Sequence, residues 1–277
     1  SSIETQRDLL ADRLEAQYSG LEVDMAVSSN IESLRDDMTF TVTTGHQLNI
    51  FSGPMSFHYK ILSTIKLTEQ LNESFPQYRF VPIYWMNSED HDFEEIGQMH
   101  LFRQTYRWDT DQVGATGRML NKGLDGISNE LRERLRTGHA KDLLDIFRKA
   151  YSDSDNLAGA TRAFVNALYG DQGLVILDSD DAMLKASFEQ TVQQELTEQN
   201  LSEPIKKTSA ELKNRGYHNQ VNPRPINLFY LTRDGRNLIL PQKDGFSIKD
   251  TDIVFSEDEL MVKLRSEPQK FSYNVVT

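Results

Sequence analysis

The sequence has no cysteine among its 277 residues, which excludes disulfide bonds and thiolate metal sites within it. It has no run of roughly 18 apolar residues, the length of a membrane-spanning helix, and no signal-peptide pattern at its start. Basic residues are outnumbered, 30 against 42 acidic ones, so the formal net charge is −12 and the surface repels nucleic-acid phosphates. We therefore expect a cytoplasmic protein that acts on small molecules and has neither nucleic-acid nor membrane partners.

What the sequence does contain is typical of a globular α/β protein of one or two domains, with 38% hydrophobic and 26% charged residues. Two β-branched or apolar runs, Thr39–Gly45 and Phe80–Met86, predict strands. The helical pattern of Met55–Leu71 lies between them, and Gly173–Asp178 predicts a third buried strand. Strand, helix and strand in this order predict a parallel, doubly wound, Rossmann-like sheet.

The chain is predicted to have three parts. Residues 1–38 form an N-terminal helical segment with a helical pattern over 3–35, residues 39–200 form the first half of the Rossmann-like core, and residues 201–277 form a small β-containing connecting module. Within this module, Ile226–Pro241 predicts a hairpin that turns at Asp234 and Gly235. Other predictions are a strand or hairpin arm at Met99–Asp109, a loop at 110–126, helices at 127–136, 140–151, 156–169 and 181–199, and a shared helix face for Tyr59, Leu62, Ile65, Lys66 and Leu71.

The loop after the first strand reads "GHQLNIFSGP" (Gly45–Pro54) and leads into a helix. Its glycines permit positive φ and close backbone approach, and a helix N-terminus attracts anions, so a phosphate or carboxylate fits there. The loop is neither a Walker A motif nor a GxGxxG motif. A plain turn with a helix cap is the alternative, and residue spacing alone favours it. Lys60 or Lys66 on the following helix can reach an anion, although a solvated surface lysine is the preferred interpretation.

The stretch after the second strand, "NSEDHDFEEI", gathers acidic and imidazole side chains within a few positions. One interpretation is an amine site, because carboxylates bind an ammonium group and His91 transfers protons near neutral pH. A second is a metal site that combines His91 with Glu94 or Glu95 at helical spacing. A third is a solvated helix start, where acids are favoured. We favour the amine site, and we expect this stretch and the Gly45–Pro54 loop to share one crevice at the carboxyl ends of the strands.

Two long stretches, "TTGHQLNIFSGPMSFHYKILSTIKL" and "FVPIYWMNSEDHDFEEI", closely resemble the bacillithiol biosynthesis cysteine-adding enzyme family, BshC. The segments "GLVILDSDDAMLK" and "INLFYLTRDGR" are also similar to the family, and the resemblance covers most of the chain. It implies a Rossmann core like that of class I aminoacyl-tRNA synthetases, with connecting modules and a coiled coil that supports a homodimer. The implied reaction joins the carboxyl group of L-cysteine to the amine of glucosaminyl-malate.

The resemblance and the motifs together give the expected site. Its catalytic residues are His46, Asp90 and His91; its substrate- or nucleotide-binding residues are Gly45, Gln47, Asn49, Gly53, Pro54, Ser88, Glu89 and Asp92. ATP or another nucleotide is the expected cofactor, and no metal is predicted. The synthetase HIGH signature is degraded at "PMSFHY", and the chain is expected to be a fragment with most of the coiled coil outside it. The alternatives are a non-catalytic nucleotide- or sugar-binding module and a metal-dependent hydrolase.

Overall fold

The computed structural model describes residues 6–199, 202–218 and 224–273. The chain forms two compact units, residues 1–179 and 180–277. This division differs from the predicted boundary between residues 200 and 201. The difference arises because Val192 and Leu196, which the sequence assigned to the Rossmann-like core, pack in the hydrophobic core of the second unit.

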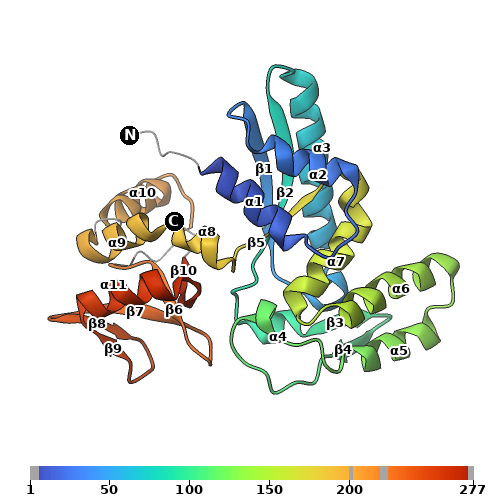
Figure 1. Ribbon diagram of the computed structural model, residues 1–277. Helices are drawn as coiled ribbons and strands as arrows, with labels where there is room; N and C mark the ends of the chain where they lie inside the picture. Colours follow the sequence, from blue (N-terminus) through green and yellow to red (C-terminus); the bar gives the residue numbers. More distant parts are fainter. Residues whose placement is uncertain (1–5, 200–201, 219–223, 274–277) are drawn as a thin grey trace. The chain divides into compact units, whose positions relative to one another are not determined.

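A three-stranded parallel sheet forms the centre of the first unit (Figure 1). Its strands are β1 (Thr39–His46), β2 (Arg79–Met86) and β5 (Val175–Asp178), in the order β1-β2-β5. β2 pairs in parallel register with both neighbours, so most of its side chains are buried. The predicted α/β class and parallel Rossmann-like sheet are therefore confirmed.

Helices pack against all three strands. α3 (Met55–Ser74) packs on β1 and β2, and α7 (Leu157–Tyr169) packs on β5. The described part of the segment predicted to be helical, residues 3–35, contains two helices, α1 (Arg7–Gln17) and α2 (Met25–Ser33). The break follows from Gly20, whose φ is +85°, and from Asp24, whose carboxylate accepts from the Ala26 N–H and caps α2.

The buried face of α3 is also different from the predicted one. Phe57, Ile61 and Ile65 are buried at helical spacing, whereas Tyr59 is 66% exposed and Leu62 is 44% exposed. The sequence pattern allowed two apolar stripes, and packing against the sheet selects the one that contains Phe57. Tyr59 and Leu62 therefore lie toward the outer side of this helix.

The chain between β2 and β5 makes a long excursion from the sheet. The segment predicted as a strand or a hairpin arm, Met99–Asp109, contains a two-stranded hairpin, because Phe102 and Arg103 both have positive φ values and make a tight turn. α5 and α6 then lie side by side (Figure 1). The bounds are α4 Phe93–Ile96, β3 Gln98–Leu101, β4 Gln104–Arg107, α5 Leu124–Arg134 and α6 Gly138–Asp153, with 3-10 turns at Ile50–Ser52, Thr116–Arg118 and Gly170–Gln172.

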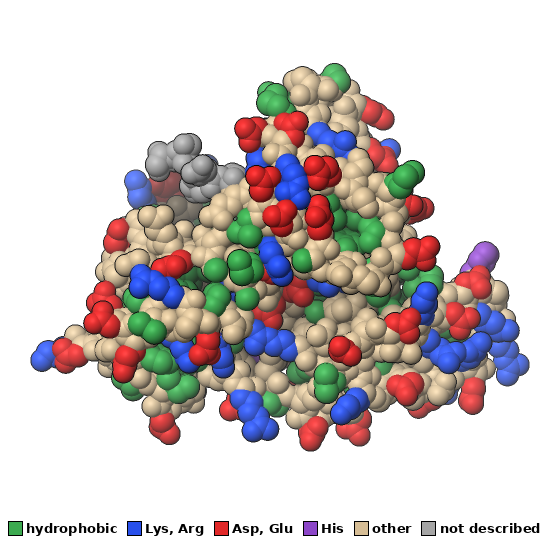
Figure 2. Space-filling view, viewed as in Figure 1, with side chains coloured by type: hydrophobic (Ala, Val, Ile, Leu, Met, Phe, Trp, Pro, Cys, Tyr) green, Lys and Arg blue, Asp and Glu red, His purple; other side chains and the backbone are tan. Residues whose placement is uncertain are grey.

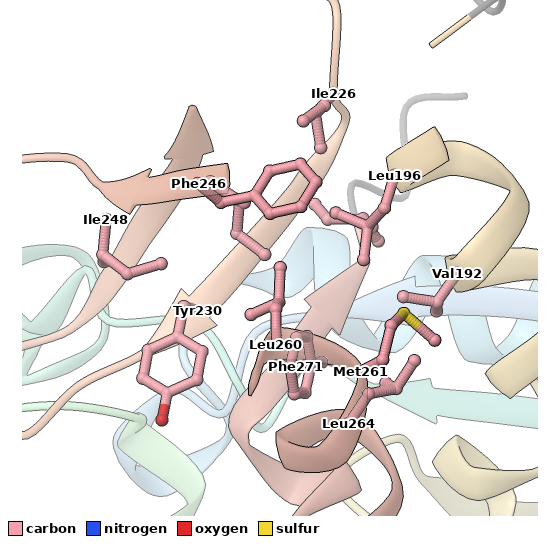
Figure 3. Packing of buried hydrophobic residues seen from close by; sticks show 12 residues of the cluster. Val192, Leu196, Ile226, Tyr230, Phe246, Ile248, Leu260, Met261, Leu264 and Phe271 are labelled. Atoms are coloured by element: carbon pink, nitrogen blue, oxygen red, sulfur yellow. The ribbon is translucent and has the colours of Figure 1, made fainter. Parts of the chain in front are cut away.

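The second unit has an antiparallel sheet in the order β10-β6-β7-β8-β9. The predicted hairpin is confirmed as β6 and β7, and the predicted helix over 181–199 is interrupted at Ser187 and Phe188. Apolar side chains from the sheet and from α9 and α11 form its core (Figure 3). The bounds are α8 Ala182–Ala186, α9 Glu189–Glu198, α10 Ser202–Asn214, β6 Leu228–Leu231, β7 Arg236–Gln242, β8 Gly245–Ile248, β9 Val254–Phe255, α11 Glu257–Ser266, a 3-10 turn at Pro268–Lys270 and β10 Phe271–Tyr273.

The excess of acidic residues is visible on the surface of the first unit, where Asp and Glu side chains gather around basic ones (Figure 2). Four carboxylates surround the Arg35 guanidinium, and their hydrogen bonds raise its pKa. Three of these acids belong to α1 and one to α2, so Arg35 connects the two helices; the acids are Asp8, Asp12, Glu15 and Glu32. Within the described residues, no helix combines the length and apolar character that crossing a membrane requires.

Candidate active site

The loop between β1 and α3 is held in an unusual backbone conformation. Phe51, Ser52 and Gly53 have consecutive positive φ values of 50°, 66° and 61°. A Cβ atom at Gly53 would lie 2.3 Å from the Asn49 Cβ, so glycine is required there by packing as well as by φ. The Asn49 side chain is buried and its Nδ2 donates to the Glu95 carbonyl, 3.2 Å away. The loop is thereby fixed to the segment that follows β2.

The two predicted motifs meet at the carboxyl ends of β1 and β2. The Gln47 Nε2 donates to the Asp90 Oδ2 at 2.7 Å, and the Asn87 N–H donates to the His46 carbonyl at 3.1 Å. The other oxygen of Asp90 accepts from the His91 N–H at 2.8 Å. Both oxygens of Asp90 thus accept hydrogen bonds, and its carboxylate defines the geometry of residues 87–92, which we call the acidic loop.

The remaining predicted residues take different environments. The His46 Nδ1 lies 3.0 Å from the Gln47 carbonyl, and its ring meets the edge of the Phe57 ring. The His91 side chain is 48% exposed, with its Nδ1 3.9 Å from the Asp90 Oδ1. The Asp92 carboxylate accepts from the Glu95 N–H at 3.3 Å and caps α4. Of the rest, Ser88 and Glu89 are buried, while Gly45 and Pro54 are exposed.

The acidic loop is also held by a buried hydrogen-bond network on β5 and α7 that the sequence analysis missed. The Ser88 hydroxyl donates a short hydrogen bond to Asp178, the last residue of β5. The Arg162 guanidinium of α7 lies 3.4 Å from the other Asp178 oxygen and is only 10% exposed. The Gln17 Oε1 accepts from the Asp178 N–H at 2.9 Å. The only sequence signal was an acid at the end of an apolar strand, a position that faces the ligand edge in parallel sheets.

Asp178 also affects its neighbour on β2. Burial raises the pKa of the Tyr84 phenol, and the Asp178 charge raises it further, so this hydroxyl stays protonated. The Tyr84 O–H donates to the His46 carbonyl at 3.3 Å. The ends of all three strands are consequently joined by side-chain hydrogen bonds.

This combination of a glycine-containing loop and an acidic loop at the strand ends can be compared with known proteins. The family described as bacillithiol biosynthesis BshC, N-terminal Rossmann-like domain, matches residues 1–277. The chain belongs to the BshC family. A Flavobacterium johnsoniae protein named cysteine ligase BshC is 43% identical over 274 residues, which cover 98% of this chain and 51% of that protein.

Other BshC relatives agree in extent. The Christiangramia forsetii protein of the same name is 41% identical over 278 residues, covering 99% of this chain and 52% of its own length. The Salinibacter ruber protein, also named cysteine ligase BshC, is 35% identical over 281 residues, covering 98% and 51%. The chain thus spans about half the length of the curated relatives it matches.

In this BshC chain, two cavities within the first unit lie away from the carboxyl ends of the strands. One of about 290 Å³ lies between α3 and the start of β2 and is lined by residues such as Thr68 and Arg79. The other, about 880 Å³, lies between the α1–α2 connection and the helices α6 and α7. Among the described residues, no group of three or more histidine, cysteine or acidic side chains is placed to hold a metal ion.

His58, which the sequence gave no role, joins the strained loop to α7 in this BshC chain. Its Nε2 lies 2.9 Å from the Ser52 Oγ, and its Nδ1 lies 2.6 Å from the Tyr169 hydroxyl. Burial lowers the pKa of the His58 imidazole, because the charged form is poorly solvated there. The neutral ring donates through one nitrogen and accepts through the other.

We expect the stability of the protein to depend on the protonation of His58. The pKa of His58 is lower in the folded state than in the unfolded state, where it is roughly 6.5. The contribution of the neutral ring to the free energy of unfolding is therefore complete above the pKa of the unfolded state, and it is lost as the pH falls through the pKa of the folded state. Urea unfolding between pH 8 and pH 5 should therefore show a falling free energy of unfolding, and His58→Gln should make this fall shallower. His139→Gln, at an exposed position on α6, is the control. Equal slopes for wild type and His58→Gln would contradict the assignment.

Proposed function

We propose that this chain is the N-terminal part of an enzyme that joins the carboxyl group of L-cysteine to the amine of glucosaminyl-malate, completing bacillithiol. Membership in the BshC family and relatives named cysteine ligase support the reaction class. The observation that carries the proposal for the site is the 2.7 Å hydrogen bond between Gln47 and Asp90. This hydrogen bond brings the loop between β1 and α3, which is suited to binding an anion, and the acidic loop to the carboxyl ends of the same strands, where parallel sheets bind ligands.

The acidic loop suits the amine substrate. A glucosamine amine is an ammonium ion at neutral pH and must lose a proton before it attacks a carbonyl carbon. Asp90 is proposed to hold the ammonium group, with Glu89 and Asp92 adding to the negative potential. His91, whose side chain is half-exposed beside Asp90, or Asp90 itself takes the proton. Removal of this proton is the step in which the chain's own residues take part directly.

The loop between β1 and α3 suits the activated carboxyl group. When bound, ATP or another nucleotide would supply the phosphoryl or nucleotidyl group that makes the cysteine carboxyl reactive. The residues proposed to hold it are Gly45, His46, Gln47, Asn49, Gly53 and Pro54. One observation fits an anionic group there: within the described residues, no side chain caps the first turn of α3. A second observation fits a hydrogen-bond donor such as a hydroxyl group: in the part of the chain that the structure describes, the buried Asn49 Oδ1 accepts no hydrogen bond.

The test is product formation by the full-length protein. Incubation with L-cysteine, glucosaminyl-malate and ATP should give a new thiol-containing amide, measured by mass spectrometry, and omission of any substrate should abolish it. Parallel reactions with GTP and CTP identify the nucleotide. A folded protein that forms no amide with any nucleotide would instead support the non-catalytic binding module. Activity lost with chelator and restored by zinc would support the hydrolase-type metal site.

The assembly and the cellular setting are part of the same proposal. We propose a cytoplasmic homodimer held by a coiled coil mostly outside this chain, acting without nucleic-acid or membrane partners. The absence of cysteine from these 277 residues suits the handling of a thiol substrate, because no thiol of this part competes for disulfide exchange. Light scattering of the full-length protein measures the oligomeric state.

A further inference from the structure

Lys60 occupies an open corner of the candidate active site. It lies in the second turn of α3, and its Nζ is 3.4 Å from the carbonyl oxygen of Gly45, near the end of β1. Gly45 is exposed, and a Cβ atom built there would meet no atom closer than 3.8 Å. The nearest side-chain atom is the Asn87 Oδ1, from the residue that follows β2. There is therefore open space at Gly45, at the end of β1 that the Lys60 ammonium reaches.

Lys60 has no carboxylate partner within the part of the chain that the structure describes, a property that it shares with several exposed lysines but not with the next lysine of α3. On the same helix, Lys66 pairs with Glu69 at 2.8 Å. In the second unit, Lys185 pairs with Asp180 and Lys263 with Glu267. In a protein with a net charge of −12, a lysine that binds only a backbone carbonyl keeps its charge available for an anion.

The neighbouring charges set the direction in which a substrate would bind. Asp90 accepts a hydrogen bond from Gln47, and the Lys60 ammonium donates to the carbonyl of Gly45, two residues earlier, so an acidic and a basic group both reach the end of β1. A substrate with an ammonium group at one end and carboxylates at the other fits this arrangement of opposite charges. The sugar–malate substrate has both groups, and its carboxylates take no part in amide formation.

We propose that Lys60 is the cationic residue that binds a carboxylate of the amine substrate and so sets its orientation. This inference rests on the proposed function for the identity of the substrate. The anion could also be a nucleotide phosphate, since a lysine binds both groups as a point charge. We favour the carboxylate as the ligand of Lys60, because Lys60 and the acidic loop together match the charges at the two ends of a single substrate.

The test uses the full-length protein and direct binding, so that it does not depend on turnover. Calorimetry should show that Lys60→Met weakens glucosaminyl-malate binding by about 10- to 100-fold, as expected for loss of a charged hydrogen bond. Methionine keeps the apolar stem, so packing along α3 is retained. Lys60→Arg should restore part of the affinity. Lys66→Met, on the same helix, is the matched control and should leave the affinity unchanged.

A second probe separates the carboxylate from the rest of the ligand. The wild type should bind glucosaminyl-malate more tightly than its dimethyl ester, and this preference should disappear in Lys60→Met. Equal affinities of wild type and Lys60→Met for glucosaminyl-malate would overturn the inference, as would a loss confined to ATP binding. If the carboxylate preference depends on Lys60 but no amide is formed, the carboxylate site stands and the proposed reaction fails.

Discussion

Asp90→Asn is expected to lower the rate of cysteine ligation strongly in the full-length protein, and His91→Ala is expected to do the same. General base catalysis typically accelerates a reaction by roughly 10²- to 10⁴-fold, so replacing the residue that takes the proton should lower the rate by a factor of that order. Asparagine is close in shape to aspartate, and its oxygen can still accept from the His91 N–H. A rotation of the Gln47 amide preserves the other hydrogen bond, so the change removes charge with little effect on the loop.

The control for this prediction is Glu94→Gln. Glu94 is exposed in the first turn of α4, where an acid favours the helix start, and we expect a rate close to that of the wild type. Thermal melting of each variant checks that folding is unchanged. Wild-type rates for both Asp90→Asn and His91→Ala would remove the catalytic role and leave the acidic loop as a structural feature.

Arg162→Met is expected to have the largest effect on stability. The Arg162 side chain is 10% exposed and the Asp178 side chain 18%, so the substitution removes a positive charge from beside a largely buried carboxylate. Breaking such a pair costs about 3–5 kcal/mol, and we expect the lower end because the Ser88 hydroxyl still donates to Asp178. For a unit of this size, a loss of about 3 kcal/mol lowers the melting temperature by roughly 6–12 °C.

The matched control is Arg148→Met on the adjacent helix α6. Arg148 lies 3.7 Å from Asp145, but both side chains are about half exposed, so the pair should contribute less than about 1 kcal/mol. Replacing Asp178 as well, in Arg162→Met with Asp178→Asn, should recover part of the stability, because the largely buried negative charge is then removed together with the positive one. If Arg162→Met and Arg148→Met have the same melting temperature, the ion pair between Arg162 and Asp178 is not a significant source of stability.

Strand positions were predictable because their residues carry strong local signals. β1, β2 and β5 are β-branched or apolar runs that end at polar residues, and each was placed within two residues of its observed bounds. The breaks after α1 and between α8 and α9 were not predicted. At Gly20 a single positive φ ends a helical pattern, and the apolar periodicity continues on both sides of it.

The candidate site was only partly predictable for a different reason. Residues next to one another in sequence, such as Ser88 and Asp90, could be grouped because they follow one strand. The partners of Ser88 come from β5 and α7, and nothing in a single sequence indicates that Arg162 lies beneath that loop. The sequence offered Lys60 and Lys66 equally as anion ligands, and only the structure shows that Lys60 reaches the Gly45 carbonyl while Lys66 pairs with Glu69.

The pairing of β2 with β5 has a consequence for how the site is assembled in time. Ile83–Met86 pair with Val175–Asp178, so segments roughly 90 residues apart must meet, whereas hairpins and helices form from neighbouring residues. Closing so long a loop carries an entropic cost that local elements do not have, so this contact should form late. Asp178 reaches Ser88 only in that step, and partly folded chains would therefore have most of their helices while the acidic loop is still unsupported.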